Sequence, residues 1–154
     1  MRLGQTTTTY DAEGQFVEQG LVNLTREQIE SALPGFRGTI SQVPPAFSAV
    51  QVAGRRAYNM ARHGETPILA PRSVTIHRLD LLSWQSPDLT LNVTCSAGTY
   101  IRSLAHDLGQ VLGCGGHLVA LTRTAAGGFT LEDAHGPAHV ESAFKAGRGK
   151  SEHR

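Results

Sequence analysis

The residues best suited to chemistry lie where an expected strand passes into an expected helix. Apolar and polar residues alternate over Leu89–Cys95, which is typical of a half-buried strand. From Ile101 onward apolar residues recur at helical spacing, so we expect a helix over roughly Tyr100–Leu112. Arg102 falls in the first turn of that helix, at the positive end of the helix dipole, where a carboxylate would be favoured. Because residues that break a local rule tend to be functional, Arg102 is the first candidate for a site.

A guanidinium at a strand-to-helix corner can bind an anion through its planar fork of N–H groups. The spacing leaves three partners open: a phosphate, a catalytic carboxylate, or an ordinary surface carboxylate. Around it, we expect Gly98 to form the tight corner, Thr99 to cap the helix and Gly113 to end it in a left-handed conformation.

Length and composition indicate one domain. A chain of 154 residues can bury a continuous core without disulfides. No apolar run approaches the roughly 20 residues of a membrane helix, and no signal peptide follows Met1, so we expect a cytoplasmic protein with no membrane contact. Cys95 and Cys114 are too few for a disulfide framework or a four-ligand zinc site, and are expected as buried thiols.

The net charge of +1 conceals an uneven distribution of arginine. Of the 14 basic residues 12 are arginine, and five of these lie between Arg55 and Arg78. Arginine is preferred to lysine where phosphates or stacked bases are bound. The stretch therefore indicates a nucleic-acid-binding surface, with a solvated charged face as the alternative.

The sequence as a whole predicts an α+β fold, a mixed β-sheet flanked by helices. Residues 1–134 are expected to form the folded domain, and residues 135–154, which lack periodicity, a flexible C-terminal tail. The other expected elements are extended segments in 1–10 and 16–17, a helix over 25–33 opened by a capping box, a stiff loop over 36–50, a helix over 55–62, a strand over 72–82 that forms a hairpin with 89–95, and a strand over 117–124.

Five motifs occur in order along the chain. They are Gly4-x-x-Thr7-x-Thr9-x-Asp11; Phe36-x-Gly38-x-Ile40-x-Gln42-x-Pro44-Pro45-x-Phe47-Ser48-Ala49; Gly54-Arg55-x-x-Tyr58-x-x-Ala61-Arg62-x-Gly64; Cys95-Ser96-x-Gly98-Thr99-Tyr100-Ile101-Arg102-Ser103-Leu104, followed by Asp107-Leu108-Gly109 and Leu112-Gly113-Cys114-Gly115; and Leu121-x-Arg123-Thr124-x-x-Gly127. Together they closely resemble the TruB-type tRNA pseudouridine synthases, from Met1 to about Ala134.

The resemblance implies an isomerase that converts the T-loop uridine at tRNA position 55 to pseudouridine, without a metal or organic cofactor. It also implies tRNA as partner and a monomeric full-length protein. In such enzymes the target base is flipped out of the loop, and an aspartate breaks the glycosidic bond before the uracil rejoins through carbon. By this resemblance Arg102 pairs with that aspartate, Tyr100 lines the base pocket, and Leu121 belongs to the strand beside it. The residues expected to bind RNA are Arg55, Arg56, Tyr58, Arg62 and Arg123.

The departures from the family pattern concern the catalytic aspartate most of all. In the family it stands in a Gly-x-Leu-Asp-Pro segment, which this sequence does not contain. The family's base-stacking tyrosine, expected just before Arg2, is missing too, and Gln51 replaces a usual lysine. The C-terminal RNA-binding extension common in bacterial members is also expected to be absent.

The aspartates that are present do not fill this gap. Asp11 is expected in a structural or RNA-contacting role and Asp107 in a surface or hinge contact. None of Asp11, Asp80, Asp88, Asp107 and Asp133 lies in the catalytic motif. The sequence therefore resembles the C-terminal two-thirds of the catalytic domain, truncated at the N-terminus, and is expected to be inactive alone.

Three hypotheses follow from the sequence. The chain is part of a tRNA pseudouridine synthase, a non-catalytic RNA-binding module that keeps the basic surface, or a small α+β interaction domain whose arginines only provide solubility. The density of motifs argues against the third. An in-frame Gly-x-Leu-Asp-Pro segment upstream of Met1 would favour the first over the second.

Overall fold

The computed structural model describes residues 1–49, 51–52, 54–65, 67 and 69–148. It divides into two compact units, Met1–Ala120 and Leu121–Arg154. The boundary expected near residue 134 stays a prediction. No helix in the described part of the chain is both long and apolar enough to cross a membrane.

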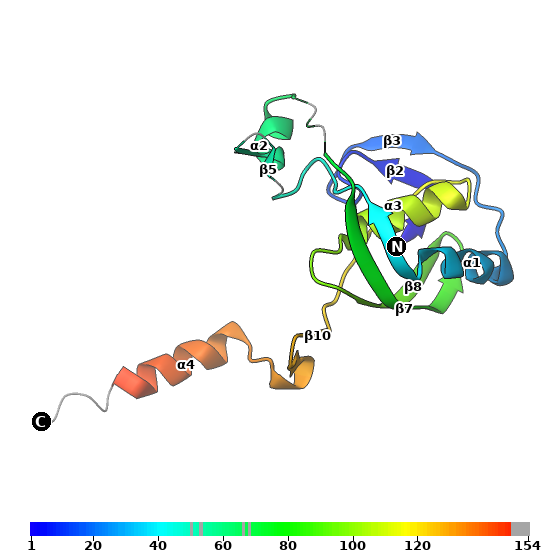
Figure 1. Cartoon of the computed structure of the whole chain (residues 1–154). Coiled ribbons are helices and arrows are strands. Elements are labelled where there is room, and N and C mark those ends of the chain that lie inside the picture. The colour runs from blue at the N-terminus through cyan, green and yellow to red at the C-terminus, as the bar shows by residue number, and fades with distance from the viewer. Residues whose placement is uncertain (50, 53, 66, 68, 149–154) are drawn as a thin grey trace, which may run out of the picture. The chain divides into compact units, whose positions relative to one another are not determined.

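A five-stranded sheet with the order β4-β7-β8-β1-β9 forms the centre of the first unit (Figure 1). Its neighbouring strands all pair antiparallel, and one isolated parallel bridge joins Asp11 to Leu118. The expected hairpin is present, with Leu79 opposite Val93. The strands are β1 (Arg2–Leu3), β4 (Gly38–Gln42), β7 (Arg72–Gln85), β8 (Asp88–Cys95) and β9 (Gly116–His117).

Helices α1 (Arg26–Ala32) and α3 (Ile101–Val111) share one hydrophobic core with this sheet. Ile29 from α1 and Leu104 and Leu108 from α3 are at most 1% exposed. In Figure 1 both helices lie beside the long β7–β8 hairpin. The α+β class expected from the sequence is thereby confirmed.

The capping box of α1 is also confirmed. Thr25 accepts a hydrogen bond from the backbone of Gln28, and the Gln28 side chain accepts one from the backbone of Thr25. The shorter elements of the first unit are β2 (Gln5–Thr7), β3 (Phe16–Gln19), the 3-10 helix η1 (Leu33–Phe36), β5 (Gln51–Val52), β6 (Arg55–Arg56) and α2 (Ala57–Arg62). The helix expected over 55–62 thus begins at Ala57, because Arg55 and Arg56 pair with β5 as a strand.

The strand expected over 117–124 is wrong. Only Gly116–His117 forms a paired strand, in register with Leu3 and Arg2 of β1. Leu118 turns to a different partner, an isolated parallel bridge to Asp11, and residues 119–124 have no regular structure.

The second unit contains a small hairpin and a helix. A Gly127-Gly128 turn joins β10 (Ala125–Ala126) to β11 (Phe129–Thr130), and the 3-10 helix η2 (Leu131–Asp133) follows. Where the sequence led us to expect no regular structure, the chain forms α4 (Pro137–Arg148). This helix starts with proline, whose fixed φ suits a first helical position, and continues with helix-favouring alanines. Whether the segment is flexible stays a prediction.

Two glycines bring α3 against β9. A Cβ atom added to Gly109 of α3 would lie 2.2 Å from the backbone nitrogen of Gly116, so no side chain fits there. By contrast, a Cβ added to Gly35 in η1 meets nothing within 4 Å. The contact fixes the distance between the helix that carries Arg102 and the sheet.

Replacing Gly109 with alanine should therefore destabilise the first unit. We expect Gly109→Ala to lower the free energy of unfolding by about 1–3 kcal/mol, the usual cost of overpacking a close contact. Gly35→Ala is the matched control and should leave stability unchanged or raise it by up to about 1 kcal/mol. The fluorescence of the single tryptophan, Trp84 in β7, reports on this unit during denaturant unfolding. Equal denaturant midpoints for Gly109→Ala and Gly35→Ala would contradict this expectation.

Candidate functional site

The corner between β8 and α3 is built by a short turn. Gly98 has a φ of +81°, as expected for the residue that makes the corner. Thr99 does not cap the helix, because its hydroxyl donates back to the Ser96 carbonyl at 2.8 Å. The N-cap residue is Tyr100, and its side chain makes no capping bond. The helix ends as expected, with Gly113 at a φ of +75°.

A buried glutamine takes the place of a side-chain cap. Gln42, at the end of β4, is 1% exposed. Its Oε1 accepts from the Tyr100 N–H at 2.8 Å, and its Nε2 donates to the Tyr100 carbonyl at 3.0 Å. This two-point contact fixes the backbone at the start of α3. The sequence shows Gln42 inside a motif, but nothing local indicates a partner 58 residues away.

Arg102 forms a shielded ion pair with Asp11. Its Nη1 donates to Asp11 Oδ2 at 3.1 Å and to the Thr9 carbonyl at 3.3 Å, and its Nη2 donates to the Phe47 carbonyl at 3.0 Å. The side chains of Arg102 and Asp11 are 26% and 20% exposed, so this is not an ordinary surface pair. These bonds use three of the five guanidinium N–H groups and leave two without an acceptor in the described part of the chain.

Asp11 is itself held in place by its own turn. Its Oδ1 accepts from the Thr9 hydroxyl and from the Glu13 N–H, the latter at 3.1 Å, while its carbonyl accepts from the Thr7 hydroxyl at 2.6 Å. The turn therefore presents Oδ2 to Arg102 in a fixed direction. A structural or RNA-contacting role was expected for Asp11, and the structure pairs its carboxylate with Arg102.

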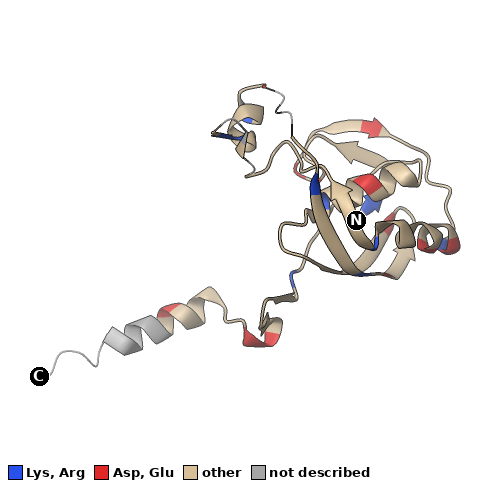
Figure 2. Ribbon diagram, viewed as in Figure 1, with Lys and Arg blue, Asp and Glu red and all other residues tan. Residues whose placement is uncertain are grey.

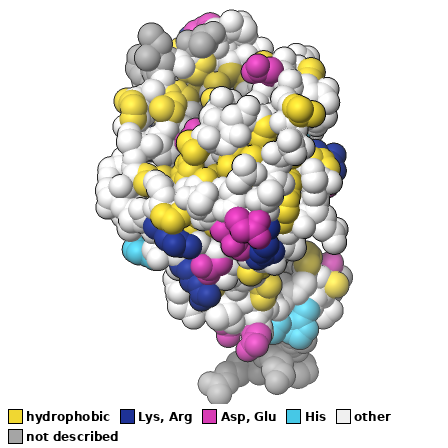
Figure 3. All heavy atoms as spheres, turned by 90° about the vertical axis from the view of Figure 1, so that its right-hand side faces the viewer, with side chains coloured by type: hydrophobic (Ala, Val, Ile, Leu, Met, Phe, Trp, Pro, Cys, Tyr) yellow, Lys and Arg dark blue, Asp and Glu magenta, His cyan; other side chains and the backbone are white. Residues whose placement is uncertain are grey.

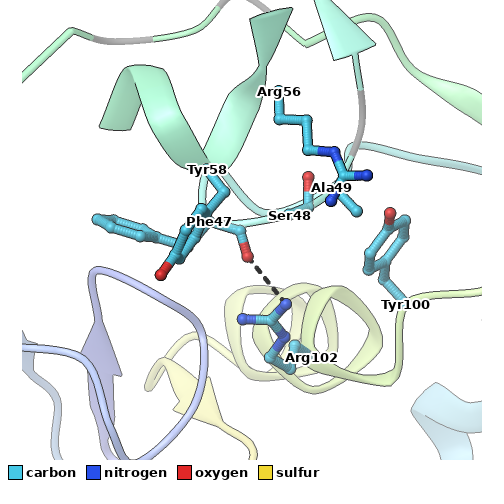
Figure 4. Close-up of a pocket in the computed structure, with 7 residues that line it drawn as sticks. All are labelled: Phe47, Ser48, Ala49, Arg56, Tyr58, Tyr100 and Arg102. Carbon is cyan, nitrogen blue, oxygen red and sulfur yellow. Dashed lines mark hydrogen bonds between the residues drawn. The ribbon is translucent and has the colours of Figure 1, made fainter. Parts of the chain in front are cut away.

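A cavity of about 380 Å³ opens beside the guanidinium, and we call it the Arg102 pocket. Figure 4 shows Tyr100 and Arg102 on one side of it, Arg56 and Tyr58 on the other, and the loop of Phe47 between them. Its lining residues are Phe47, Ser48, Ala49, Arg56, Tyr58, Tyr100 and Arg102. Two guanidinium groups and three aromatic rings suit a ligand that is both anionic and planar, such as a nucleotide.

Many of the other arginines are already paired with carboxylates. Arg55 forms two hydrogen bonds to Glu65, at 2.9 and 3.0 Å, and Arg78 pairs with Asp80. Basic and acidic segments are interspersed over the first unit in Figure 2, and on the face in Figure 3 several dark blue side chains lie against magenta ones. Three arginines of the predicted basic stretch have no carboxylate within ion-pair distance among the described residues: Arg56, Arg62 and Arg72.

The structure brings together four of the predicted site residues. Tyr100, Arg102, Arg56 and Tyr58 line one pocket, and the Arg62 guanidinium lies 4.4 Å from the Tyr58 ring centroid. Arg55 lies next to Arg56 but is paired with Glu65. Leu121 and Arg123 belong to the second unit, which is described by itself, so their place beside Tyr100 stays a prediction.

The comparisons with known proteins agree with the motifs. The family model described as TruB family pseudouridylate synthase (N terminal domain) matches residues 1–101, about two-thirds of the chain. The chain belongs to the TruB family. A second family model, described as tRNA pseudouridylate synthase B C-terminal domain, matches residues 102–153. The TruB similarity therefore extends beyond Ala134, the limit that the motifs indicated.

Relatives in the TruB family include several bacterial proteins named tRNA pseudouridine synthase B. The Pseudomonas paraeruginosa protein is 55% identical over 134 residues, which cover 87% of this chain and 44% of the relative. The Stutzerimonas stutzeri protein is 50% identical over 151 residues, covering 92% of this chain and 50% of the relative. This chain thus spans about half the length of the curated relatives it matches.

Solved structures are also similar to this chain. A chain from the crystal structure of a Cbf5-Nop10-Gar1 complex is 28% identical, with a TM-score of 0.47, over 64% of this chain and 25% of that chain.

Helix α3 also carries a half-buried carboxylate, that of Asp107. Asp107 was expected as a surface or hinge contact, but burial raises its pKa above the ordinary value of 3.8, only partly offset by His106. Asp88, the first residue of β8, shows the reverse, since the hydrogen-bonded Arg2 guanidinium lowers its pKa. The ionised carboxylate of Asp107 is therefore disfavoured by folding, and that of Asp88 is favoured.

These opposite pKa shifts predict opposite effects of neutralisation. At pH 7 both carboxylates are ionised in the unfolded chain, so Asp107→Asn should raise the free energy of unfolding and Asp88→Asn should lower it. Both effects should diminish as the pH falls toward 3, because Asp107 becomes protonated in the folded protein and Asp88 becomes protonated in the unfolded chain. Denaturant unfolding at pH 7 and at about pH 3 measures both. A loss of stability in Asp107→Asn at pH 7 would contradict the pKa direction.

Proposed function

We propose that this chain supplies the arginine-bearing side of a pseudouridine synthase active site that acts on the T-loop uridine at tRNA position 55. The observation that carries the proposal is the Arg102 pocket, in which a fixed guanidinium, a second arginine and aromatic rings converge. Membership of the TruB family supports this choice over other nucleotide-binding functions. The proposal includes tRNA as partner, a cytoplasmic location and a monomeric full-length enzyme.

Within this proposal the pocket receives the flipped uridine. The Tyr100 ring lines the space for the base, and Arg102 orients the reacting carboxylate. The two N–H groups of Arg102 that lack an acceptor in the described part of the chain would bind the nucleophilic aspartate. A close guanidinium favours the ionised form of such a carboxylate and fixes its orientation.

RNA binding is assigned to the arginines that keep an unpaired charge. Arg56 reaches into the pocket, and Arg62 stacks on Tyr58 above it, so both can meet phosphates or bases next to the flipped nucleotide. By family resemblance we assign Leu121 to the supporting residues of the active site and Arg123 to RNA binding. Residues 1–134 would then form part of the catalytic domain, followed by the tail.

A non-catalytic RNA-binding module is the second candidate function. It is favoured by one observation, that the 154 residues contain no Gly-x-Leu-Asp-Pro segment. Both candidates require RNA binding at the Arg102 pocket, and they differ in whether the reaction occurs once a nucleophilic aspartate is available.

Binding to a T-loop stem-loop RNA tests what both candidates share. We expect salt-sensitive binding, because arginine contacts to phosphates release counterions. Arg56→Ala should weaken binding and reduce the slope of log K against log salt by about one. Arg55→Ala is the matched control, and a smaller effect is expected because Glu65 already neutralises Arg55. Equal effects of the two variants, or affinity independent of salt, would count against the assigned surface.

Tritium release from uridine labelled at carbon 5 tests the reaction itself. The 154-residue chain should release no tritium from the stem-loop RNA, because its sequence lacks the aspartate motif. Release by this chain would show that another group is the nucleophile. If a longer reading frame supplies Gly-x-Leu-Asp-Pro, its product should release tritium, and failure to do so would favour the binding module.

A further inference from the structure

The turn that carries Asp11 contains an unusual backbone conformation. Tyr10 has a φ of +63°, and it is the one residue other than glycine with a positive φ in the described part of the chain. For a residue with a Cβ atom this left-handed conformation costs about 1–2 kcal/mol. Two backbone bonds hold it: the Tyr10 N–H donates to the Thr7 carbonyl at 3.3 Å, and its carbonyl accepts from the Leu118 N–H at 2.9 Å.

The Tyr10 side chain is held as well. Its ring stacks on the imidazole of His106, with centroids 3.9 Å apart and planes 14° from parallel. The buried His106 Nδ1 has no hydrogen-bond partner among the described residues. His106 is therefore positioned by packing against Tyr10 rather than by a polar contact of that nitrogen.

The contacts of α3 with this turn converge on three consecutive residues. Arg102 Nη1 binds the Thr9 carbonyl and Asp11 Oδ2, and these two residues flank Tyr10. Four positions later on the same face of α3, His106 holds the Tyr10 ring. Helix α3 thus contacts the turn at the Thr9 carbonyl, at the Asp11 carboxylate and at the Tyr10 ring between them.

We propose that the Tyr10–His106 stack is a positioning device that holds the Asp11 turn against α3, so that Asp11 keeps Arg102 oriented toward the pocket. Neither residue lines the pocket, so both act through the ion pair and not on a ligand. The importance of that orientation for RNA modification rests on the proposed function, whereas the positioning itself can be measured without any RNA.

The charged and titratable groups around the stack agree with a packing role. Burial lowers the pKa of His106 below 6.5, against the opposing effect of Asp107, so the ring is neutral at pH 7. Burial and Asp107 raise the pKa of the Tyr10 hydroxyl, so that ring is neutral as well.

Nitrogen-15 NMR of the Arg102 guanidinium in the full 154-residue chain tests the proposal. The hydrogen bonds to Asp11 and Phe47 slow rotation about the Nε–Cζ bond, so Nη1 and Nη2 should exchange slowly in the wild type. Tyr10→Gly keeps the left-handed backbone accessible but removes the ring, and His106→Leu removes the other ring. Each variant should speed the exchange between Nη1 and Nη2 by about tenfold. This factor is the fold-change that corresponds to the free energy of one aromatic pair.

Conservative variants separate positioning from general stability. Tyr10→Phe and His106→Phe keep two stacked rings and should retain slow exchange. Asp11→Asn breaks the ion pair and gives the exchange rate of an unpaired Arg102 for comparison. Circular dichroism confirms that each variant is folded. Slow exchange in folded Tyr10→Gly or His106→Leu would overturn the proposal, as would fast exchange in both phenylalanine variants. If the wild type shows slow exchange but does not bind the stem-loop RNA, the proposed function fails while the positioning stands.

Discussion

The shielded ion pair between Arg102 and Asp11 is the interaction on which the arrangement of the pocket depends. An arginine in the first turn of a helix is opposed by the helix dipole, and partial burial adds a desolvation cost. Here both are offset by one carboxylate and two backbone carbonyls that accept from the same guanidinium. These three acceptors come from two separate loops, so a single side chain ties the Asp11 turn and the Phe47 loop to the start of α3.

The rest of the first unit holds α3 where this can happen. Gln42 fixes the backbone of Tyr100 with two hydrogen bonds, and the Gly109–Gly116 contact sets how closely the helix approaches the sheet. Neither contact involves a charged group, and Gln42, Gly109 and Gly116 do not line the pocket. The site thus rests on backbone positions fixed at both ends of one helix, which restricts the directions available to Tyr100 and Arg102.

What the sequence predicted well was local. The capping box at Thr25, the glycine corner at Gly98 and the β7–β8 hairpin each depend on residues close together in the chain. The features it missed depend on distant partners: the backbone at the start of α3 is bound by Gln42, and after His117 the chain leaves β1 and Leu118 bridges to Asp11. Arg102 could be recognised as a residue that breaks a local rule, but its partner Asp11 lies 91 positions away.

Charge pairing also explains why composition alone overstated the basic surface. Arg55 and Arg78 belong to the arginine-rich stretch, yet Glu65 and Asp80 neutralise them. An exposed ion pair of this kind adds little stability, but it removes a positive charge that would otherwise attract any polyanion. The unpaired arginines include Arg56 in the pocket and Arg62 on Tyr58. The pocket therefore contains one arginine without a carboxylate partner among the described residues, Arg56, beside the paired Arg102.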